Sequence, residues 1–369
     1  MSDTESSVKG ISLRGIQADA YFSVRVVRQL ERFQKSGGYI AHIMAPWWSL
    51  YLHEGRDVLR RRLPELHPAM SEEATTTFEQ SRHGLKMFLD TKRDITAYED
   101  YFAKIQAAHR ERFVERVRPG FRWMADDLGV TTYSGRVVTT THGVAFATGL
   151  EPEAVLDEDM GLRLKRLWTE AGGSFAFAAL AGDGPPPSLV QTWQDDQFST
   201  EDFKSHKYYP KIFSGPEHPH LNAVLLHYLG MVNSADVLFP LVFDLESDEY
   251  TIFKIRYLVT SHVLGSLKKL SEGDRQLPET SANHLVDLLG NVPSVVSTER
   301  PWLRNLLVHY EPNVRSDFSR FNRDHLLAGI VAIAEVPERL DDLVELTNRN
   351  LRHLADGLNA WMVAPEAPR

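Results

Sequence analysis

The 369-residue sequence contains no cysteine. It therefore has no disulfide, no thiolate nucleophile and no cysteine ligand for a metal, which suits a reducing compartment. A long apolar run is also missing, since the longest nearly uninterrupted one, residues 326–336, is about half of the roughly 20 residues that a membrane span needs. The first seven residues are polar and acidic, which is not the pattern of a signal peptide. These absences predict a soluble, cytoplasmic protein with no membrane partner.

The recognised catalytic fingerprints are absent as well. The sequence holds no Gly-x-Gly-x-x-Gly dinucleotide motif, no phosphate loop ending in Gly-Lys-Ser or Gly-Lys-Thr, no His-Glu-x-x-His pair and no Gly-x-Ser-x-Gly elbow. Four residues have the side chains of metal ligands without a recognised spacing: His218, His220, His227 and Asp236. We therefore expect no metal and no cofactor.

The chain also has fewer positively charged than negatively charged side chains. Lys and Arg number 41 against 50 Asp and Glu, a net charge of -9, whereas proteins that bind nucleic acid along its backbone usually carry a basic face. A local exception is a group of five arginines within 24 residues: Arg300, Arg304, Arg315, Arg320 and Arg323. They either form a small positive pocket that admits a few phosphates or pair with acids on a solvated surface, and the sequence leaves both alternatives open.

Helical periodicity dominates the rest of the chain. In the first part, helices are expected over residues 16–33, 72–89, 94–117 and 151–168, with a buried aromatic stretch over 39–52. Two β-branched runs on either side of Ser134-Gly135 predict a small hairpin. In the last part, helices are expected over residues 221–232, 250–270, 281–289, 298–310, 324–335 and 337–362.

The predicted fold is therefore mainly α, with a C-terminal helical bundle preceded by a mostly helical N-terminal domain that contains the hairpin. A break in composition, Ser-Gly-Pro-Glu-His-Pro at residues 214–219, places the domain boundary near 215 and divides the chain into 1–215 and 216–369. The basic and aromatic stretch 204–211 lies just before this break. It either contacts RNA by stacking and charge or, the preferred interpretation, packs on the neighbouring domain. The sequence assigns no role to residues 1–215.

The most informative stretch is residues 302–310, Trp-Leu-Arg-Asn-Leu-Leu-Val-His-Tyr. Its leucines recur at helical spacing, so Arg304, Asn305 and His309 are out of place on an apolar helix. A polar group buried without a partner costs about 1 to 3 kcal/mol, so these three side chains must meet partners, water or a substrate.

An arginine followed directly by an asparagine, then by apolar residues and a histidine late in a helical region, resembles the signature of the HEPN family (higher eukaryotes and prokaryotes nucleotide-binding). The resemblance covers this motif and the helical region around it, not the first half of the chain. It implies a metal-independent endoribonuclease, a hydrolase of toxin–antitoxin, phage-defence or RNA-processing systems. It also implies a homodimer with RNA as substrate and with an antitoxin or other regulatory protein as partner. Arg304 and His309 are then catalytic, Asn305 orients them, and the flanking arginines bind RNA: Arg300, Arg315, Arg320 and Arg323.

The chemistry of the motif is concrete. Cleavage of RNA through its own 2′-hydroxyl needs a base near the nucleophile and a proton for the leaving oxygen, and histidine suits either task. An arginine provides a fixed positive fork for the phosphoryl oxygens. Five residues along an ideal helix leave Arg304 and His309 about 140° apart, and a dimer with two facing motifs resolves this separation. Two alternatives stay open: a noncatalytic HEPN-like binding or scaffold protein, and an unrelated helical small-molecule enzyme.

Overall fold

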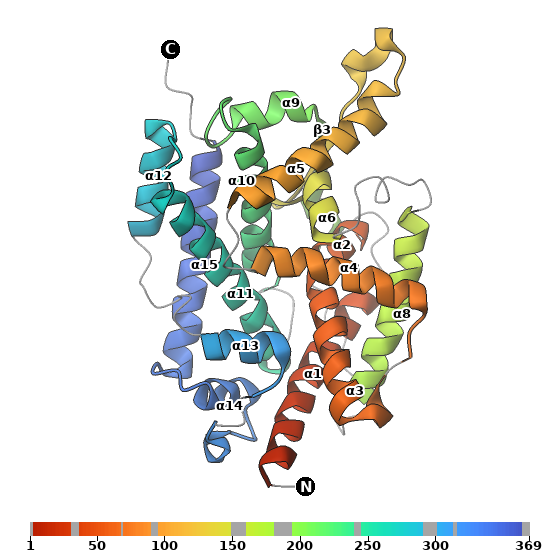
Figure 1. Cartoon of the computed structure of the whole chain (residues 1–369), viewed down its shortest axis with the longest axis vertical. Helices are drawn as coiled ribbons and strands as arrows, with labels where there is room; N and C mark the ends of the chain where they lie inside the picture. Colours follow the sequence, from red (N-terminus) through yellow and green to blue (C-terminus); the bar gives the residue numbers. More distant parts are fainter. Residues whose placement is uncertain are drawn as a thin grey trace.

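The structure is a computed structural model that describes residues 3–30, 37–67, 69–89, 95–148, 160–180, 194–239, 245–290, 301–312 and 316–363. As the sequence predicts, it is mainly α, with one small antiparallel sheet (Figure 1). The α-helices up to residue 215 are α1 (Asp3–Leu30), α2 (Gly37–Leu50), α3 (Arg56–Arg62), α4 (Glu72–Leu89), α5 (Ile95–Arg110), α6 (Thr141–Thr148), α8 (Met160–Leu180) and α9 (Ser205–Tyr208). The later ones are α10 (Pro219–Asn233), α11 (Leu245–Glu272), α12 (Glu279–Gly290), α13 (Pro301–His309), α14 (Leu326–Ile333) and α15 (Leu340–Met362).

Short 3-10 and π-helical turns connect several of these helices. Among these elements are the π-helical turns η1 (Tyr51–Gly55) and η3 (Glu111–Glu115), and the 3-10 helix η4 (Pro119–Met124). η1 continues α2 directly into α3, so α2, η1 and α3 form one nearly continuous run of helix. A π-helical turn adds a residue to the helical repeat and so changes the direction of the side chains that follow.

The sheet has the strand order β2-β1-β3, in which β1 is Leu128–Tyr133, β2 is Arg136–Thr140 and β3 is Phe198–Phe203. Both neighbouring pairs are antiparallel. The predicted hairpin between β1 and β2 is confirmed, and its two-residue turn has positive φ at Ser134 (50°) and Gly135 (77°). That combination matches the right-handed twist of the strands. The third strand, β3, was not predicted from the sequence.

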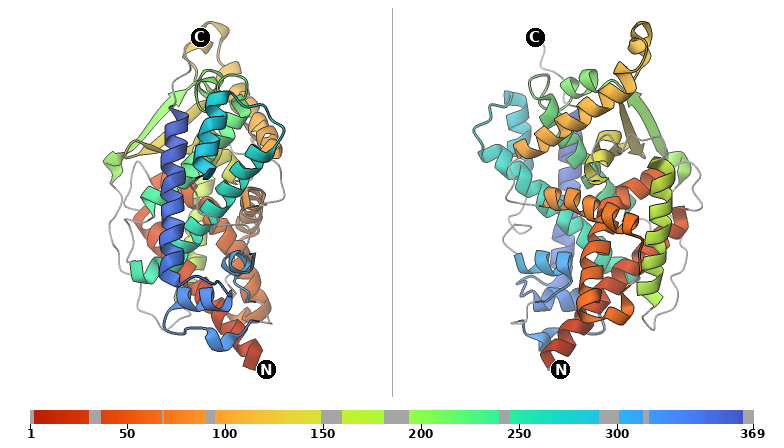
Figure 2. Two further views of the ribbon diagram at one scale, coloured as in Figure 1. Left: turned by 90° about the vertical axis from the view of Figure 1, so that its left-hand side faces the viewer. Right: turned by 45° about the vertical axis from the view of Figure 1, so that its right-hand side comes forward.

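The helices on the two sides of residue 215 pack against one another. α10 lies against β2 and α5, and α1 lies along α11 as well as α8. α15 packs on α10, α11 and α12, and Figure 2 shows it running along the length of the molecule. Buried side chains from both sides of the predicted boundary, such as Trp48 and Leu354, belong to one hydrophobic cluster. The division at residue 215 stays a prediction.

The lack of a long apolar run in the sequence predicts that no helix spans a membrane. Within the described residues, no helix combines the length and the apolar character that crossing a bilayer demands.

Candidate functional site

The predicted motif forms a short amphipathic helix, α13. Its buried side is made by Leu303, Leu306 and Leu307, which pack toward η1 and α14. Its opposite side presents Trp302 and His309, with Asn305 between them, and all three are exposed. Positions separated by three and four residues share one helix face. The structure therefore brings Asn305 and His309 onto one exposed face, next to a tryptophan that is 59% exposed.

His309 is bound by a carboxylate from a distant part of the chain. Its Nδ1 lies 2.7 Å from Oε2 of Glu54, in the π-helical turn η1. The other carboxylate oxygen, Oε1, accepts hydrogen bonds from Arg82 of α4, at 3.0 Å from Nε and 2.5 Å from Nη2. The side chain of His309 is 49% exposed, whereas those of Glu54 and Arg82 are only 15% and 9% exposed. The exposed imidazole of His309 is thus held in place by the mostly buried ion pair of Glu54 and Arg82.

The charges of this cluster determine which nitrogen of His309 carries a proton. Burial alone would raise the pKa of Glu54, but the hydrogen bond with His309 and the charge of Arg82 outweigh it and lower that pKa to about 2. Glu54 is therefore ionised at neutral pH and can only accept hydrogen bonds. Nδ1 of His309 must then carry the hydrogen, so in the neutral ring the lone pair sits on Nε2.

Arg304 lies on a different side of α13. Its side chain is partly buried and close enough to His262 of α11 for its charge to act there. Burial is the main reason that the pKa of His262 is well below its usual value, and the positive charge of Arg304 lowers it further. α13 is a regular helix, so the side chains of Arg304 and His309 leave it about 140° apart. Within one chain, His309 belongs to the cluster with η1 and α4, and Arg304 lies toward α11.

The other predicted substrate-binding arginines fall into two groups. Arg320 ends a short 3-10 helix, Phe318–Arg320, and Arg323 lies on the loop between it and α14. Both are exposed, and the backbone carbonyl of Arg323 accepts a hydrogen bond from Arg14 of α1. Arg300 and Arg315 lie outside the described residues.

The acid beside the motif in sequence is not the one that contacts its histidine. Glu311 instead binds Arg61 and Arg62 of α3, at 3.0 Å from Nη1 of the first and 2.8 Å from Nε of the second. Glu54, which does contact His309, is 255 positions away in the sequence, and sequence reasoning missed it. The only local signal is that it follows a buried apolar stretch, and this signal does not point to α13.

A buried network fixes the end of α13 immediately after His309. Tyr310 has a positive φ of 56°, and its hydroxyl donates to Oδ2 of Asp19 at 2.5 Å. The same oxygen accepts a hydrogen bond from Lys254 at 2.7 Å, and the other carboxylate oxygen accepts one from Thr251 at 2.6 Å. Burial lowers the pKa of Lys254, and the neighbouring Asp19 opposes that change. The network ties α13 to α1 and α11 and so sets the position of His309.

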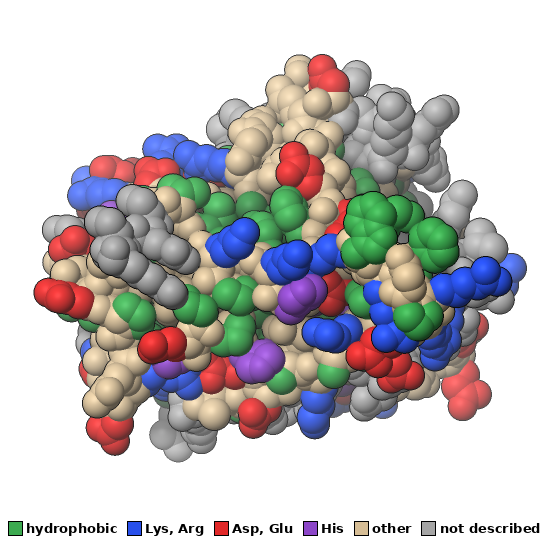
Figure 3. Space-filling view, turned by 90° about the horizontal axis from the view of Figure 1, so that it is seen from above, with side chains coloured by type: hydrophobic (Ala, Val, Ile, Leu, Met, Phe, Trp, Pro, Cys, Tyr) green, Lys and Arg blue, Asp and Glu red, His purple; other side chains and the backbone are tan. Residues whose placement is uncertain are grey.

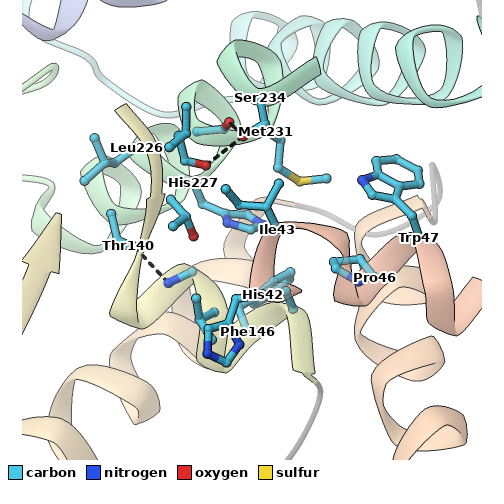
Figure 4. Close-up of a pocket in the computed structure, with 16 residues that line it drawn as sticks. His42, Ile43, Pro46, Trp47, Thr140, Phe146, Leu226, His227, Met231 and Ser234 are labelled. Atoms are coloured by element: carbon cyan, nitrogen blue, oxygen red, sulfur yellow. Dashed lines mark hydrogen bonds between the residues drawn. The ribbon is translucent and has the colours of Figure 1, made fainter. Parts of the chain in front are cut away.

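A second group of histidines lies in an apolar pocket between α2, α6, α10 and β2 (Figure 4). Burial lowers the pKa of His42 to about 4 and that of His227 to about 3, so both rings are neutral at pH 7. The other lining side chains shown in Figure 4 are apolar or carry a hydroxyl group, among them Ile43, Trp47 and Phe146. A phosphate placed there would lose its hydration without gaining a cation, so this pocket does not suit RNA.

The described part of the chain shows no evident metal-binding site. The side chains placed there include no group of three His, Asp or Glu residues suited to hold a metal ion. Among the four metal-ligand candidates from the sequence, His227 lines the apolar pocket and Asp236 pairs with Arg136.

Comparisons of this chain with protein-family models, with curated proteins and with solved structures give no match. The interpretation of the site therefore depends on the geometry of its own residues.

Proposed function

We propose that this chain is a metal-independent endoribonuclease of the HEPN type, in which His309 moves the reacting proton. The observation that carries the proposal is the arrangement of His309, exposed on α13 and bound through Nδ1 to Glu54. Histidines that act as general bases are commonly oriented by a carboxylate in this manner. The short motif in the sequence supports the choice of RNA as substrate.

The proposed reaction uses the hydroxyl that distinguishes RNA from DNA. Nε2 of His309 accepts the proton of a 2′-hydroxyl, and the resulting oxygen attacks the adjacent phosphorus. The bond between phosphorus and the 5′-oxygen breaks, and that oxygen takes up the proton that His309 accepted, which returns the imidazole to its neutral form. The products are a 2′,3′-cyclic phosphate and a 5′-hydroxyl, so no water and no redox partner is consumed.

Arg304 takes part through a second copy of the chain. Because its side chain leaves α13 about 140° from that of His309, one chain does not readily direct both groups at the same phosphate. We propose a homodimer in which the Arg304 side of α13 in one copy approaches the His309 face of α13 in the other, so that an arginine of one copy lies near the imidazole of its partner. The exposed face formed by Trp302, Asn305 and His309 supports this proposal, since a tryptophan that is 59% exposed is a good contact residue. In this role the enzyme acts in toxin–antitoxin, phage-defence or RNA-processing systems, restrained by a regulatory partner.

The test is cleavage of a mixed RNA pool in the presence of EDTA by matched histidine variants. His325 is a natural control because it is similarly exposed, at 46%, and also contacts a glutamate, Glu249, at 3.1 Å. His309→Asn should reduce cleavage at least about 100-fold, whereas His325→Asn should leave it unchanged. Arg304→Ala should also abolish cleavage while the dimer persists.

Two results would overturn the proposal. One is a purified parent protein that leaves all RNA uncut over a range of salt concentrations. The other is a His309→Asn variant that cuts as well as the parent. A stable dimer that binds RNA without cutting it would favour the noncatalytic HEPN-like alternative.

A further inference from the structure

The segment that follows α5 projects from the body of the molecule. It comprises residues 110–124, which we call the arm, and contains η3 and η4. In Figure 1 it is the gold loop at the top, beyond the end of α5. The arm exposes four large apolar side chains: Phe113 at 44%, Phe121 at 54%, Trp123 at 71% and Met124 at 56%. An exposed apolar patch of this kind commonly marks a binding surface.

The arm is also basic, in contrast to the chain as a whole. Its charged side chains are five arginines and two glutamates: Arg110, Arg112, Arg116, Arg118, Arg122, Glu111 and Glu115. The basic stretch 204–211 lies beside it, since Nζ of Lys204 donates to the backbone oxygens of Trp123 and Ala125 at 2.5 and 2.8 Å. Together the arm and this stretch hold eight Lys and Arg but only two Asp and Glu, in a chain of net charge -9. Figure 3 shows Lys and Arg side chains next to hydrophobic ones on this face.

The conformation of the arm is fixed by its own hydrogen bonds. Arg122 donates to the backbone oxygens of Val117 and Glu115, at 3.1 and 2.8 Å. With the bonds from Lys204, these contacts hold η4 in place although its side chains are exposed. The backbone that carries the exposed rings is therefore held in one conformation, which lowers the entropy lost when a ligand binds.

We infer that the arm and residues 204–211 form a binding surface for single-stranded RNA. Phosphates are attracted by the arginines and lysines, and exposed rings offer flat surfaces on which bases of any identity can stack. A duplex would hide its bases from those rings, so a single strand is the better ligand. The sequence favoured packing of 204–211 on a neighbouring domain, and part of the stretch does pack on α10. Tyr209 is buried, and its backbone oxygen accepts a hydrogen bond from Asn222 of α10. The structure shows Lys204 bound to the arm, while Lys207 and Lys211 remain exposed.

This inference rests on the proposed function in one respect, the choice of RNA as the polyanion. The arm and α13 lie toward opposite ends of the molecule (Figure 1). We therefore assign the arm to a part of the strand remote from the cleaved bond, where it raises affinity without touching the reacting atoms.

The experiment measures binding of fluorescein-labelled, mixed-sequence single-stranded RNA to the full chain carrying His309→Asn, so that cleavage does not interfere. Trp123→Ala should weaken binding at least about fivefold, because stacking of one base contributes on the order of 1 kcal/mol or more. Arg118→Ala should weaken binding and reduce the slope of log affinity against log salt by about 0.7, the value for one phosphate contact on a single strand.

Matched controls come from exposed residues elsewhere. Phe177 is 48% exposed on α8, and Arg339 is exposed with only a distant acid, Asp341 at 3.9 Å. Phe177→Ala and Arg339→Ala should leave RNA binding within a factor of about two. Duplex RNA of the same sequence should bind more weakly than the single strand.

Two results would overturn the inference: arm variants that bind RNA as tightly as the controls do, and binding through the arm to vesicles containing phosphatidylserine but not to RNA. The outcome is separable from that of the ribonuclease proposal. If the parent leaves RNA uncut but Trp123→Ala weakens binding, the arm is supported and the enzyme is not. If the parent cuts RNA and Trp123→Ala leaves KM unchanged, the enzyme is supported and the arm is not.

Discussion

Substitution of Glu54 by glutamine tests the cluster behind His309 most sharply. The amide keeps the shape of the carboxylate but removes its charge. It can also donate a hydrogen to Nδ1 of His309, which would move the ring hydrogen to Nε2 and leave no lone pair there for a substrate. Glu54→Gln should therefore reduce RNA cleavage at least about 100-fold even though His309 itself is intact.

The same substitution has a calculable effect on stability. The pKa of Glu54 is lowered from 4.5 to about 2 in the folded protein. Each pKa unit corresponds to about 1.4 kcal/mol, so ionised Glu54 contributes about 3 kcal/mol to the free energy of unfolding at pH 7. In the variant, Arg82 is left with its positive charge at a site where its side chain is only 9% exposed. We expect Glu54→Gln to lower the free energy of unfolding by about 3 kcal/mol.

The sign of the pH dependence follows from the direction of the pKa shift. Because the folded pKa lies below the unfolded one, the stabilisation is complete above about pH 4.5 and is lost as the pH falls toward 2. Urea unfolding followed by circular dichroism should show a difference of about 3 kcal/mol between parent and variant at pH 7. That difference should shrink steadily between pH 4.5 and the lowest pH at which the protein remains folded.

Glu311→Gln is the matched control. Burial would raise the pKa of Glu311, but hydrogen bonds from Arg62 and Arg61 lower it. Its side chain is 26% exposed and that of Arg61 is 45% exposed, so solvent screens this pair and we expect a loss below about 1 kcal/mol. The reasoning is refuted if Glu54→Gln costs no more than Glu311→Gln at pH 7, or if the difference between parent and variant does not change with pH.

Three further substitutions test the packing around α13, all by urea unfolding at pH 7. Asp19→Asn leaves the charge of Lys254 buried without its counter-charge and should cost about 3 to 5 kcal/mol; a loss below about 1 kcal/mol would contradict the buried ion pair. Tyr310→Phe removes the hydroxyl that donates to Asp19 and should cost about 1 to 2 kcal/mol, and an unchanged stability would show that this bond contributes nothing. Gly329→Ala places a Cβ 2.6 Å from the ring of Phe321 and 2.8 Å from the backbone oxygen of Asn322, so we expect a loss of about 1 to 3 kcal/mol. A neutral result would contradict this close packing.

The sequence predicts the long helices well where an apolar stripe recurs over several turns. The prediction for residues 72–89 coincides with α4, and that for 337–362 contains α15, which begins at Leu340. The strand β3 escaped prediction because Phe-Ser-Thr-Glu-Asp-Phe has no alternation of apolar and polar residues, and four of its six residues are exposed. Its register is set by pairing with β1 rather than by its own hydropathy pattern. Pairing between distant segments cannot be predicted from the sequence of either segment alone.

Only part of the candidate site could be predicted from the sequence. The spacing of Asn305 and His309 on one helix face follows from helix geometry, and the sequence could show that these residues do not belong in a core. The partner of His309 could not be found in this way, because Glu54 reaches it through the packing of η1 against α13. The nearest acid in sequence, Glu311, binds Arg61 and Arg62 instead, so proximity along the chain does not identify the partner of His309.

The most direct test of the central claim is the chemistry of the RNA ends produced by the purified full-length protein in EDTA. If His309 activates a 2′-hydroxyl, mass spectrometry should find 2′,3′-cyclic phosphate and 5′-hydroxyl ends with the parent protein, and almost none with His309→Asn. Ends with a 5′-phosphate and a 3′-hydroxyl, or cyclic-phosphate ends formed equally by His309→Asn, would contradict the account.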